Sequence, residues 1–224
     1  MEPQKLIPVG KLFKKSFEFY KGKLYLIMVL ALIPFANFVI ISILNGIMDY
    51  APNKAFLLVV GFIWFLFFLV TLVVSVWIQA TFFYLVKERD SVLDAKSLLK
   101  FSWKKLIPYS WVLFLMGIIS IVGFLLLIIP GIIVSVMFSM ALYMFVFEDA
   151  RGMQALYKSK DLVKGYWWPV FGRLFLFGLL GALISSVPVI GDLVNIFVTM
   201  PLGVIYAYFI YENLKTVKSQ PSIL

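Results

Sequence analysis

The chain has 224 residues, of which 63% are hydrophobic and only 14% are charged, and its formal net charge is +9. Soluble domains are usually about 45–50% apolar and about 25% charged. The composition therefore excludes an ordinary cytosolic enzyme, a disordered chain and a disulfide-built secreted module, and it predicts an integral membrane protein. The absence of Cys and His also removes disulfides, thiolate chemistry, the commonest general base and the commonest metal ligand.

Six continuous apolar runs are each long enough for a membrane-spanning helix. A bilayer core of about 30 Å takes about 20 helical residues to cross, whereas a β-barrel would show short alternating segments. The predicted spans are roughly Leu24–Met48, Ala55–Val86, Leu106–Ile129, Gly131–Phe147, Pro169–Val187 and Val189–Tyr211. The third and fourth spans are expected to join through a tight turn at Ile129-Pro130-Gly131. Pro34 and Pro201 lie inside the first and sixth spans and are expected to kink them.

The basic residues lie almost entirely on one side of these spans. Of the 20 Lys and Arg residues, only Lys54 and Arg173 fall outside the N-terminal segment, the connections after the second and fourth spans, and the C-terminal tail. Because membrane proteins concentrate Lys and Arg in their cytoplasmic loops, we expect both termini to lie in the cytoplasm. The first run is too long for the apolar core of a cleavable signal peptide, so an uncleaved span is expected there.

Three segments on the basic side show the period of an amphipathic helix. They are Leu6–Tyr20, Ser91–Trp103 and Arg151–Val163. Each combines large apolar residues on one face with basic residues on the other, which is typical of helices that lie in the membrane interface. We therefore predict an all-α polytopic fold with six transmembrane helices and three cytoplasmic interfacial amphipathic helices.

An internal repeat divides these elements into three hairpins, each preceded by a surface helix. Lys15–Gly22 matches Lys158–Gly165 at a Lys, a Ser, an acid, a Lys and a Gly, and Lys100–Lys105 is a looser third copy. The predicted units are residues 1–86, 87–147 and 148–213, with a tail at 214–224, in one membrane domain of residues 1–224. All three units enter from the cytoplasm, so the repeat is pseudo-threefold and differs from the inverted repeats common in transporters.

One stretch of the sequence resembles a known family. It contains Ile128-Ile129-Pro130-Gly131-Ile132-Ile133, then Glu148, Ala155–Ser159 and Leu162–Gly165. The pattern resembles the multi-pass membrane domain that precedes the catalytic domain in some bacterial glycerophosphodiester phosphodiesterases, and related uncharacterised prokaryotic membrane proteins. The resemblance implies a prokaryotic inner membrane and a link to lipid metabolism. It carries over no catalytic residue, because the activity of those enzymes resides in a separate soluble barrel that uses His and acidic metal ligands.

The basic helices and an aromatic belt at the cytoplasmic boundary predict contacts with anionic lipid headgroups. The candidate residues are Lys14, Lys15, Lys21, Lys104, Lys105, Lys158, Lys160, Lys164, Arg173, Trp103, Trp167 and Trp168. For most of these cations, setting the orientation in the membrane is an equally good explanation. Arg173, one turn into the fifth span, is expected to extend to lipid phosphates, and pairing with Glu148 or Asp149 is the alternative.

The carboxylates at the cytoplasmic ends of the spans are expected to have structural roles. Glu148 and Asp149 are predicted to pair with Arg151, or to cap the helix that follows. Glu88 and Asp90 are assigned the same roles beside Arg89. Binding of a divalent cation by these paired carboxylates is the alternative.

Small and polar residues within the spans predict helix packing. Small-xxx-small spacings in the fifth span allow close approach of helices, either inside the bundle or across a dimer. These residues are Gly178, Gly181, Ala182 and Ser185. Polar side chains inside the spans, including Asn37, Gln79 and Asn195, are expected to form interhelical hydrogen bonds, and a polar path through the membrane is the alternative.

These features predict a non-enzymatic membrane protein that senses or organises lipid, or that scaffolds other membrane proteins. A transporter of a small solute or lipid is the alternative, and a membrane-surface enzyme using the carboxylates near Glu88 and Glu148 is a second one. No cofactor is expected, because the chain has no Gly-x-Gly motif for a dinucleotide or phosphate loop. The expected partners are anionic lipids and a second copy or another membrane protein, and not nucleic acid.

Overall fold

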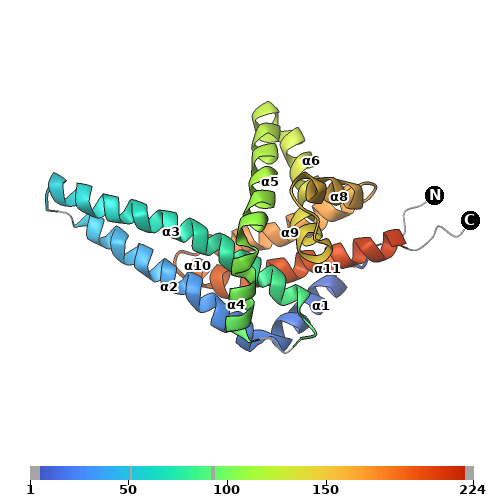
Figure 1. The fold of residues 1–224 in the computed structure, drawn as a ribbon, viewed down its shortest axis with the longest axis horizontal. Helices are drawn as coiled ribbons and strands as arrows, with labels where there is room; N and C mark the ends of the chain where they lie inside the picture. Colours follow the sequence, from blue (N-terminus) through green and yellow to red (C-terminus); the bar gives the residue numbers. More distant parts are fainter. Residues whose placement is uncertain (1–5, 51, 92–93, 220–224) are drawn as a thin grey trace, which may run out of the picture.

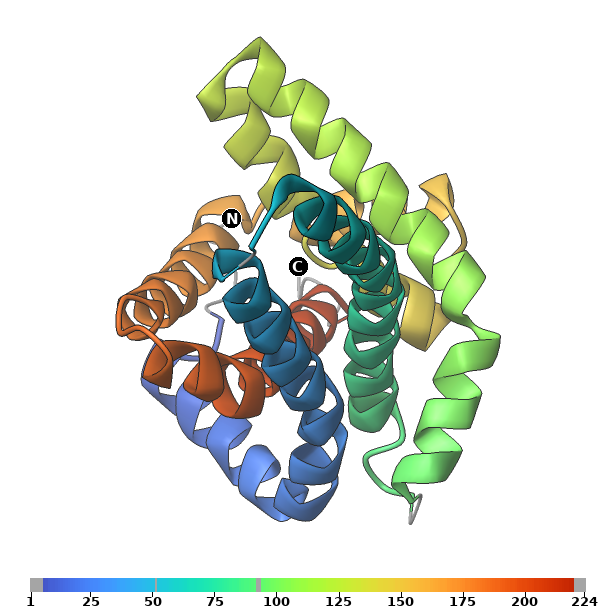
Figure 2. The same ribbon diagram turned by 90° about the vertical axis from the view of Figure 1, so that its left-hand side faces the viewer.

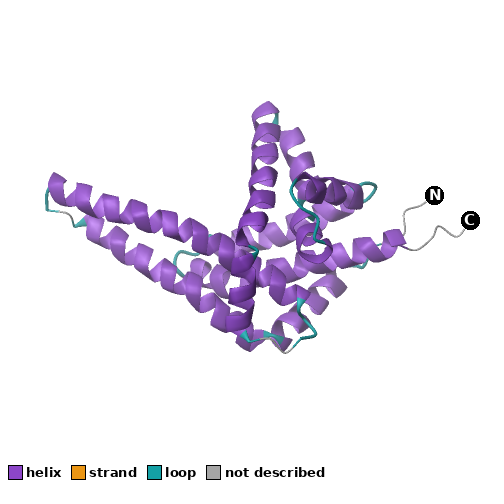
Figure 3. Cartoon of the chain, viewed as in Figure 1, coloured by secondary structure: helices purple, strands orange, loops and turns teal. Residues whose placement is uncertain are grey.

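The structure is a computed structural model that describes residues 6–50, 52–91 and 94–219 (Figure 1). All regular structure in this part of the chain is helical, as Figure 3 shows. Six helical segments are long and apolar enough to cross a membrane, which confirms the predicted all-α polytopic fold. Residues 92–93 of the second amphipathic segment and 220–224 of the predicted tail lie outside the described residues.

The helices follow an order of one short and two long segments, three times along the chain. The first set is α1 (Val9–Gly22), α2 (Leu24–Asp49) and α3 (Lys54–Lys87). The second set is α4 (Ala95–Lys104), α5 (Leu106–Leu126), and α6 (Ile128–Phe138) followed by α7 (Ala141–Glu148). The third set is α8 (Met153–Val163), α9 (Trp167–Ser185), and α10 (Ile190–Val194) followed by the π-helical segment η1 (Asn195–Thr199) and α11 (Met200–Ser219).

Side chains cap the N-termini of two helices, α3 and α4. The Asn53 side chain accepts a hydrogen bond from the Phe56 N–H at 2.9 Å at the start of α3. The Asp94 carboxylate accepts one from the Ser97 N–H at 3.3 Å at the start of α4, and hydrogen bonding with Ser97, chiefly with its side chain, lowers the pKa of Asp94. Such caps satisfy N–H groups that have no partner inside the helix.

The turn between α5 and α6 precedes Pro130, so its predicted position at Ile129-Pro130-Gly131 is wrong. Leu127 is extended and α6 begins at Ile128, which places Pro130 in the first turn of that helix. Proline is tolerated there because the first N–H groups of a helix have no intrahelical acceptor. Glycines then let the two helices approach closely, since a Cβ on Gly123 would lie 3.1 Å from the Gly131 Cα.

The fourth and sixth spans are interrupted. Ser139 and Met140 separate α6 from α7, and the π-helical η1 lies just before Pro201 at the start of α11. Proline has no N–H to donate to the carbonyl four residues earlier, so a break is expected near Pro201. Pro34, in contrast, lies inside α2, which continues through it.

The three hairpins meet at one end and separate at the other. In Figure 1 the α2–α3 hairpin extends to the left and the α5–α6 hairpin extends upward, while Figure 2 shows α9 and α10 beside the first hairpin. The buried core lies where the hairpins meet, and we call this region the junction. It includes Ile27, Leu30, Ile78, Phe82–Val86, Tyr109, Met140–Val146 and Ile205–Tyr206.

Beyond the junction, the hairpins expose large apolar side chains. Leu58 on α3 is 76% exposed and Ile128 on α6 is 70% exposed. Many exposed large apolar side chains side by side would promote aggregation in water. In a membrane the same surface faces lipid, as expected of spanning helices.

The small-residue face of α9 packs partly inside the chain. The Asn195 amide donates to the Ser185 Oγ at 2.6 Å, and a Cβ on Gly181 would lie 3.2 Å from the Thr199 side chain. Gly178 and Ala182 remain exposed. The contacts of Gly181 and Ser185 therefore lie within the chain, with the segment that contains Asn195 and Thr199.

Candidate functional site

Each short helix directs one serine into the junction, and the sequence repeat aligns two of them, Ser16 and Ser159. Ser16, Ser102 and Ser159 are fully buried, and each hydroxyl donates to a backbone carbonyl at 2.7–3.0 Å. A buried Leu or Ala lies four residues before each serine. Each short helix therefore packs the face that carries its serine against the spans and leaves most of its lysines exposed.

Two of these serines also form hydrogen bonds with a neighbouring spanning helix. The Ser159 Oγ accepts from the Met140 N–H at 3.1 Å, at the break between α6 and α7. The Ser102 Oγ lies 2.7 Å from the Thr81 Oγ and accepts from the Trp77 indole N–H at 3.1 Å. Because buried polar groups without partners are costly, these hydrogen bonds fix α4 on α3 and α8 on the fourth span.

Glu212 on α11 joins all three units. Its two carboxylate oxygens lie 2.9 Å from the Lys15 ammonium of α1 and 3.0 Å from the Arg89 guanidinium after α3. The Tyr208 hydroxyl, one turn earlier on α11, donates to the same carboxylate at 3.0 Å. The hydrogen bond to Glu212 raises the pKa of Arg89 further above its ordinary value.

Glu148, at the end of α7, forms a second network with different partners from those predicted. It pairs with Lys158 at 3.0 Å and with Lys215 at 2.8 Å, and it accepts a hydrogen bond from the Tyr211 hydroxyl at 3.2 Å. In the described part of the chain, neither Arg151 nor Asp149 lies in an ion pair, so the predicted pairing with Arg151 is wrong.

The backbone around Asp149 explains this correction. Asp149 ends α7 in the left-handed conformation, with φ 51°, and the chain then turns toward α5. Neither predicted capping role is seen, because Gly152 precedes α8 and no side chain caps that helix, while α4 is capped by Asp94. The Arg89–Asp90 pair does form, with the Arg89 Nε 3.5 Å from the Asp90 carboxylate.

Three of the residues predicted to contact lipid bind other groups of the protein instead. Lys15 and Lys158 are held in the networks of Glu212 and Glu148. The Arg173 guanidinium donates to the carbonyls of Ile7 and Pro169, each at 2.8 Å, rather than to Glu148 or Asp149. It reaches these carbonyls because the segment before α1 passes beside α9, so a free extension of Arg173 to lipid phosphates is not what the structure shows.

The other candidates remain on the surface. Five lysines are exposed and lie in no ion pair among the described residues, namely Lys14, Lys21, Lys104, Lys160 and Lys164. Lys105 is half-exposed, as is Trp167, whose indole N–H donates to the Ile133 carbonyl at 3.2 Å. Trp103 and Trp168 are exposed beside them. Four of these five lysines lie in α1, α4 or α8, and Lys164 directly follows α8.

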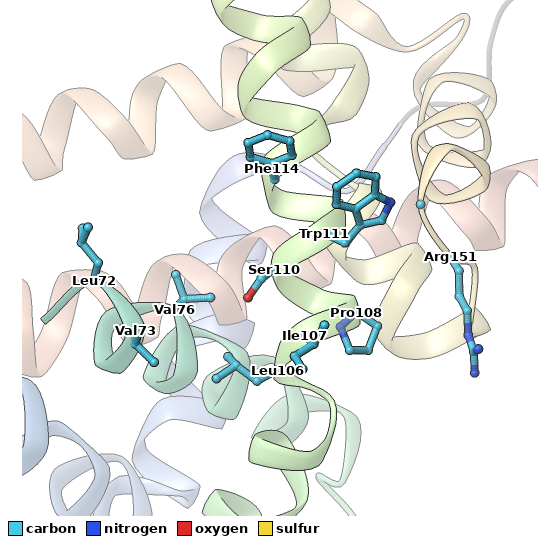
Figure 4. Close-up of a pocket in the computed structure, with 11 residues that line it drawn as sticks. Leu72, Val73, Val76, Leu106, Ile107, Pro108, Ser110, Trp111, Phe114 and Arg151 are labelled. Carbon is cyan, nitrogen blue, oxygen red and sulfur yellow. The ribbon is translucent and has the colours of Figure 1, made fainter. Parts of the chain in front are cut away.

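A large apolar groove lies between the first and second hairpins (Figure 4). Its volume is about 850 Å³. One wall comes from α3 and the other from α5, and the loop before α8 closes one end. The lining residues are Leu72, Val73, Val76, Leu106, Ile107, Pro108, Ser110, Trp111, Phe114, Arg151 and Gly152. Arg151 is the single charged residue among them, and sequence patterns do not identify the groove because it joins separate units.

Glu212 and Tyr208 belong to no sequence motif. The only sequence feature that links these two residues is their spacing of four, which places both on one face of a helix. No cluster of three or more potential metal ligands occurs among the described residues. The oxygens of Glu148 and Glu212 are engaged by cations of the protein itself.

Comparison with known proteins finds no matching family model, no matching curated protein and no matching solved structure. The resemblance to the membrane domain of glycerophosphodiester phosphodiesterases therefore stays a prediction.

Proposed function

We propose that this protein is a non-enzymatic membrane protein that gathers anionic lipids of the cytoplasmic leaflet around its three short helices. The observation that carries the proposal is the orientation of those helices. Their serine faces are buried in the junction, so Lys14, Lys21, Lys104, Lys160 and Lys164 project outward without an ion-pair partner in the described chain. Each basic residue near an anionic membrane surface contributes about 1 kcal/mol to its attraction.

The proposed setting is the inner membrane of a prokaryote, with both termini in the cytoplasm. The distribution of Lys and Arg supports this orientation, because the side of the short helices carries nearly all of them. Exposed Trp103 and Trp168 lie on the same side, where aromatic residues anchor a protein at the headgroup level. The resemblance to a membrane domain that accompanies lipid-metabolising enzymes supports the same assignment.

Hydrogen bonds within the hairpins favour this proposal over transport. The Thr71 hydroxyl lies 3.0 Å from the Asn37 side-chain oxygen, and the Trp64 indole donates to Asn45 at 3.1 Å. Both pairs join α2 to α3 of one hairpin. These polar residues therefore support helix packing, as interhelical hydrogen bonds do elsewhere in membranes.

Native mass spectrometry from nanodiscs tests the proposal. The protein is released from bilayers of equal phosphatidylglycerol and phosphatidylcholine, and the retained lipids are counted. We expect several-fold enrichment of phosphatidylglycerol for the wild type and near loss of that enrichment when Lys14, Lys21, Lys104, Lys160 and Lys164 are all changed to Gln. The matched variant with five Lys→Arg changes keeps the charge and should retain the enrichment. Equal enrichment in the Gln and Arg variants contradicts the proposal.

A further inference from the structure

We propose that the groove between α3 and α5 binds one anionic phospholipid, with its acyl chains on the apolar walls and its phosphate at Arg151. This inference rests on the proposed preference for anionic lipid, but it places a defined site at residues other than the five exposed lysines. Its two walls belong to helices that are long and apolar enough to span a membrane, and Leu72 and Val73 in one wall are exposed. Its volume of about 850 Å³ lies within the range of about 300–1,000 Å³ that is typical of ligand pockets.

The walls of the groove suit hydrocarbon. Figure 4 shows Val73 and Val76 of α3 facing the α5 side chains across the hollow, with Trp111 and Phe114 further along α5. Trp111 and Phe114 are each 54% exposed, so the protein leaves large apolar surfaces there without a protein partner. An acyl chain covers such surfaces without leaving polar groups unsatisfied.

The loop before α8 places Arg151 at one end of the groove. Gly152 has φ 50° and ψ −130°, a conformation that favours glycine, and a Cβ there would lie 3.4 Å from the Trp111 indole nitrogen. Ala150 is buried, and its N–H donates to the Met144 carbonyl at 3.2 Å. The backbone on both sides of Arg151 is thus held against the protein, while its side chain remains exposed.

The direction of Arg151 favours a phospholipid over other occupants. In Figure 4 its guanidinium points away from Phe114, in the direction of the end of α5 that carries Pro108. Arg151 therefore adds one positive charge at the edge of an otherwise largely apolar groove, which matches a phosphate and its acyl chains. A second copy or an apolar helix in the groove would desolvate Arg151 without a partner, which is costly.

Photocrosslinking with phospholipids that carry a diazirine in one acyl chain tests the site. The protein is reconstituted in nanodiscs with either a phosphatidylglycerol or a phosphatidylcholine probe, and the labelled residues are mapped by mass spectrometry. We expect labelling by the phosphatidylglycerol probe to concentrate on α5 around Trp111 and Phe114 and on α3 around Val73. Labelling spread evenly over the exposed apolar surface would overturn the inference.

Two variants separate the acyl-chain and headgroup contacts. Val73→Trp fills the groove and should reduce labelling of α5 at least several-fold with both probes. Leu58→Trp is the matched control, because Leu58 is an exposed residue of the same helix outside the groove, and it should leave labelling unchanged. Arg151→Gln should reduce phosphatidylglycerol labelling about tenfold, to the level of phosphatidylcholine, and Arg151→Lys should preserve most of it. Unchanged labelling in Val73→Trp or Arg151→Gln overturns the inference.

The five-lysine Gln variant distinguishes this site from the proposed function. If the groove is a separate site, that variant keeps its concentrated α5 labelling even where its overall enrichment of phosphatidylglycerol is lost. If Val73→Trp and Arg151→Gln have no effect while the lysine changes remove the enrichment, the groove site fails and the proposed function stands.

Discussion

The Tyr20 hydroxyl donates to the Phe197 carbonyl at 2.9 Å, four residues before Pro201. This carbonyl would normally accept from the N–H of residue 201, which proline lacks. A side chain of the first short helix thus supplies a donor at the interruption in the sixth span. Burial raises the pKa of Tyr20, so the hydroxyl keeps its proton.

Tyr20→Phe removes only this hydroxyl. We expect it to lower the free energy of unfolding by about 0.5–1.5 kcal/mol, because the partly buried Phe197 carbonyl loses a donor. Thermal unfolding in detergent micelles, followed by tryptophan fluorescence, measures the change. Pro201→Ala restores a backbone donor, so Tyr20→Phe should cost less in that background. Equal costs in both backgrounds would show that the hydroxyl does not compensate for the proline.

Ser159→Ala should destabilise the protein by about 1–3 kcal/mol, because it leaves the Met140 N–H without its acceptor at the break between α6 and α7. The same unfolding measurement applies. Ser186→Ala serves as the control, since Ser186 is exposed and its hydroxyl bonds only a carbonyl of its own helix. A similar loss in both variants would argue against a special role for the buried serine.

Gly123→Ala is expected to destabilise the α5–α6 hairpin by about 1–3 kcal/mol, because the new Cβ would lie 3.1 Å from backbone of α6. Gly117→Ala on the same helix meets nothing within 4 Å, so it should stabilise by about 0.5–1 kcal/mol through helix propensity. Opposite signs of the two changes in unfolding temperature are the expected result. The same sign for both would contradict close packing at Gly123.

Glu212→Gln removes one charge that two cations share. We expect a loss of about 1–2 kcal/mol of stability that becomes smaller as salt is added, because Lys15, Arg89 and Glu212 are all partly exposed. Unfolding temperatures at low and high ionic strength test this. Glu18→Gln on the exposed face of α1 is the control and should have little effect at either salt concentration.

The proposed orientation can be tested by labelling, because the chain has no native cysteine. Lys54→Cys should react with a membrane-impermeant maleimide in intact cells, and Lys164→Cys should react only after the membrane is opened. The reverse pattern would place the short helices outside the cell and would remove the basis for binding lipids of the cytoplasmic leaflet.

Several features of the candidate site follow from local sequence patterns. The repeat aligns Ser16 with Ser159, and the structure buries both, together with Ser102 of the third short helix. The exposure of Lys14 follows from the helical period of the first segment. Charge pairing could not be predicted in this way, because Glu148 meets Lys215 and Glu212 meets Lys15 across sequence separations far longer than a helical turn.

The sequence by itself determined that the chain crosses a membrane through six helices and carries three short basic helices. Hydrophobic length and helical period are local properties that no distant residue alters. Only the tertiary structure decided which cations remain free, where Arg173 and Arg151 point, and that α3 and α5 enclose a groove. Those outcomes depend on how the hairpins meet at the junction, which is a sum of many packing and hydrogen-bond contacts between residues far apart in the chain.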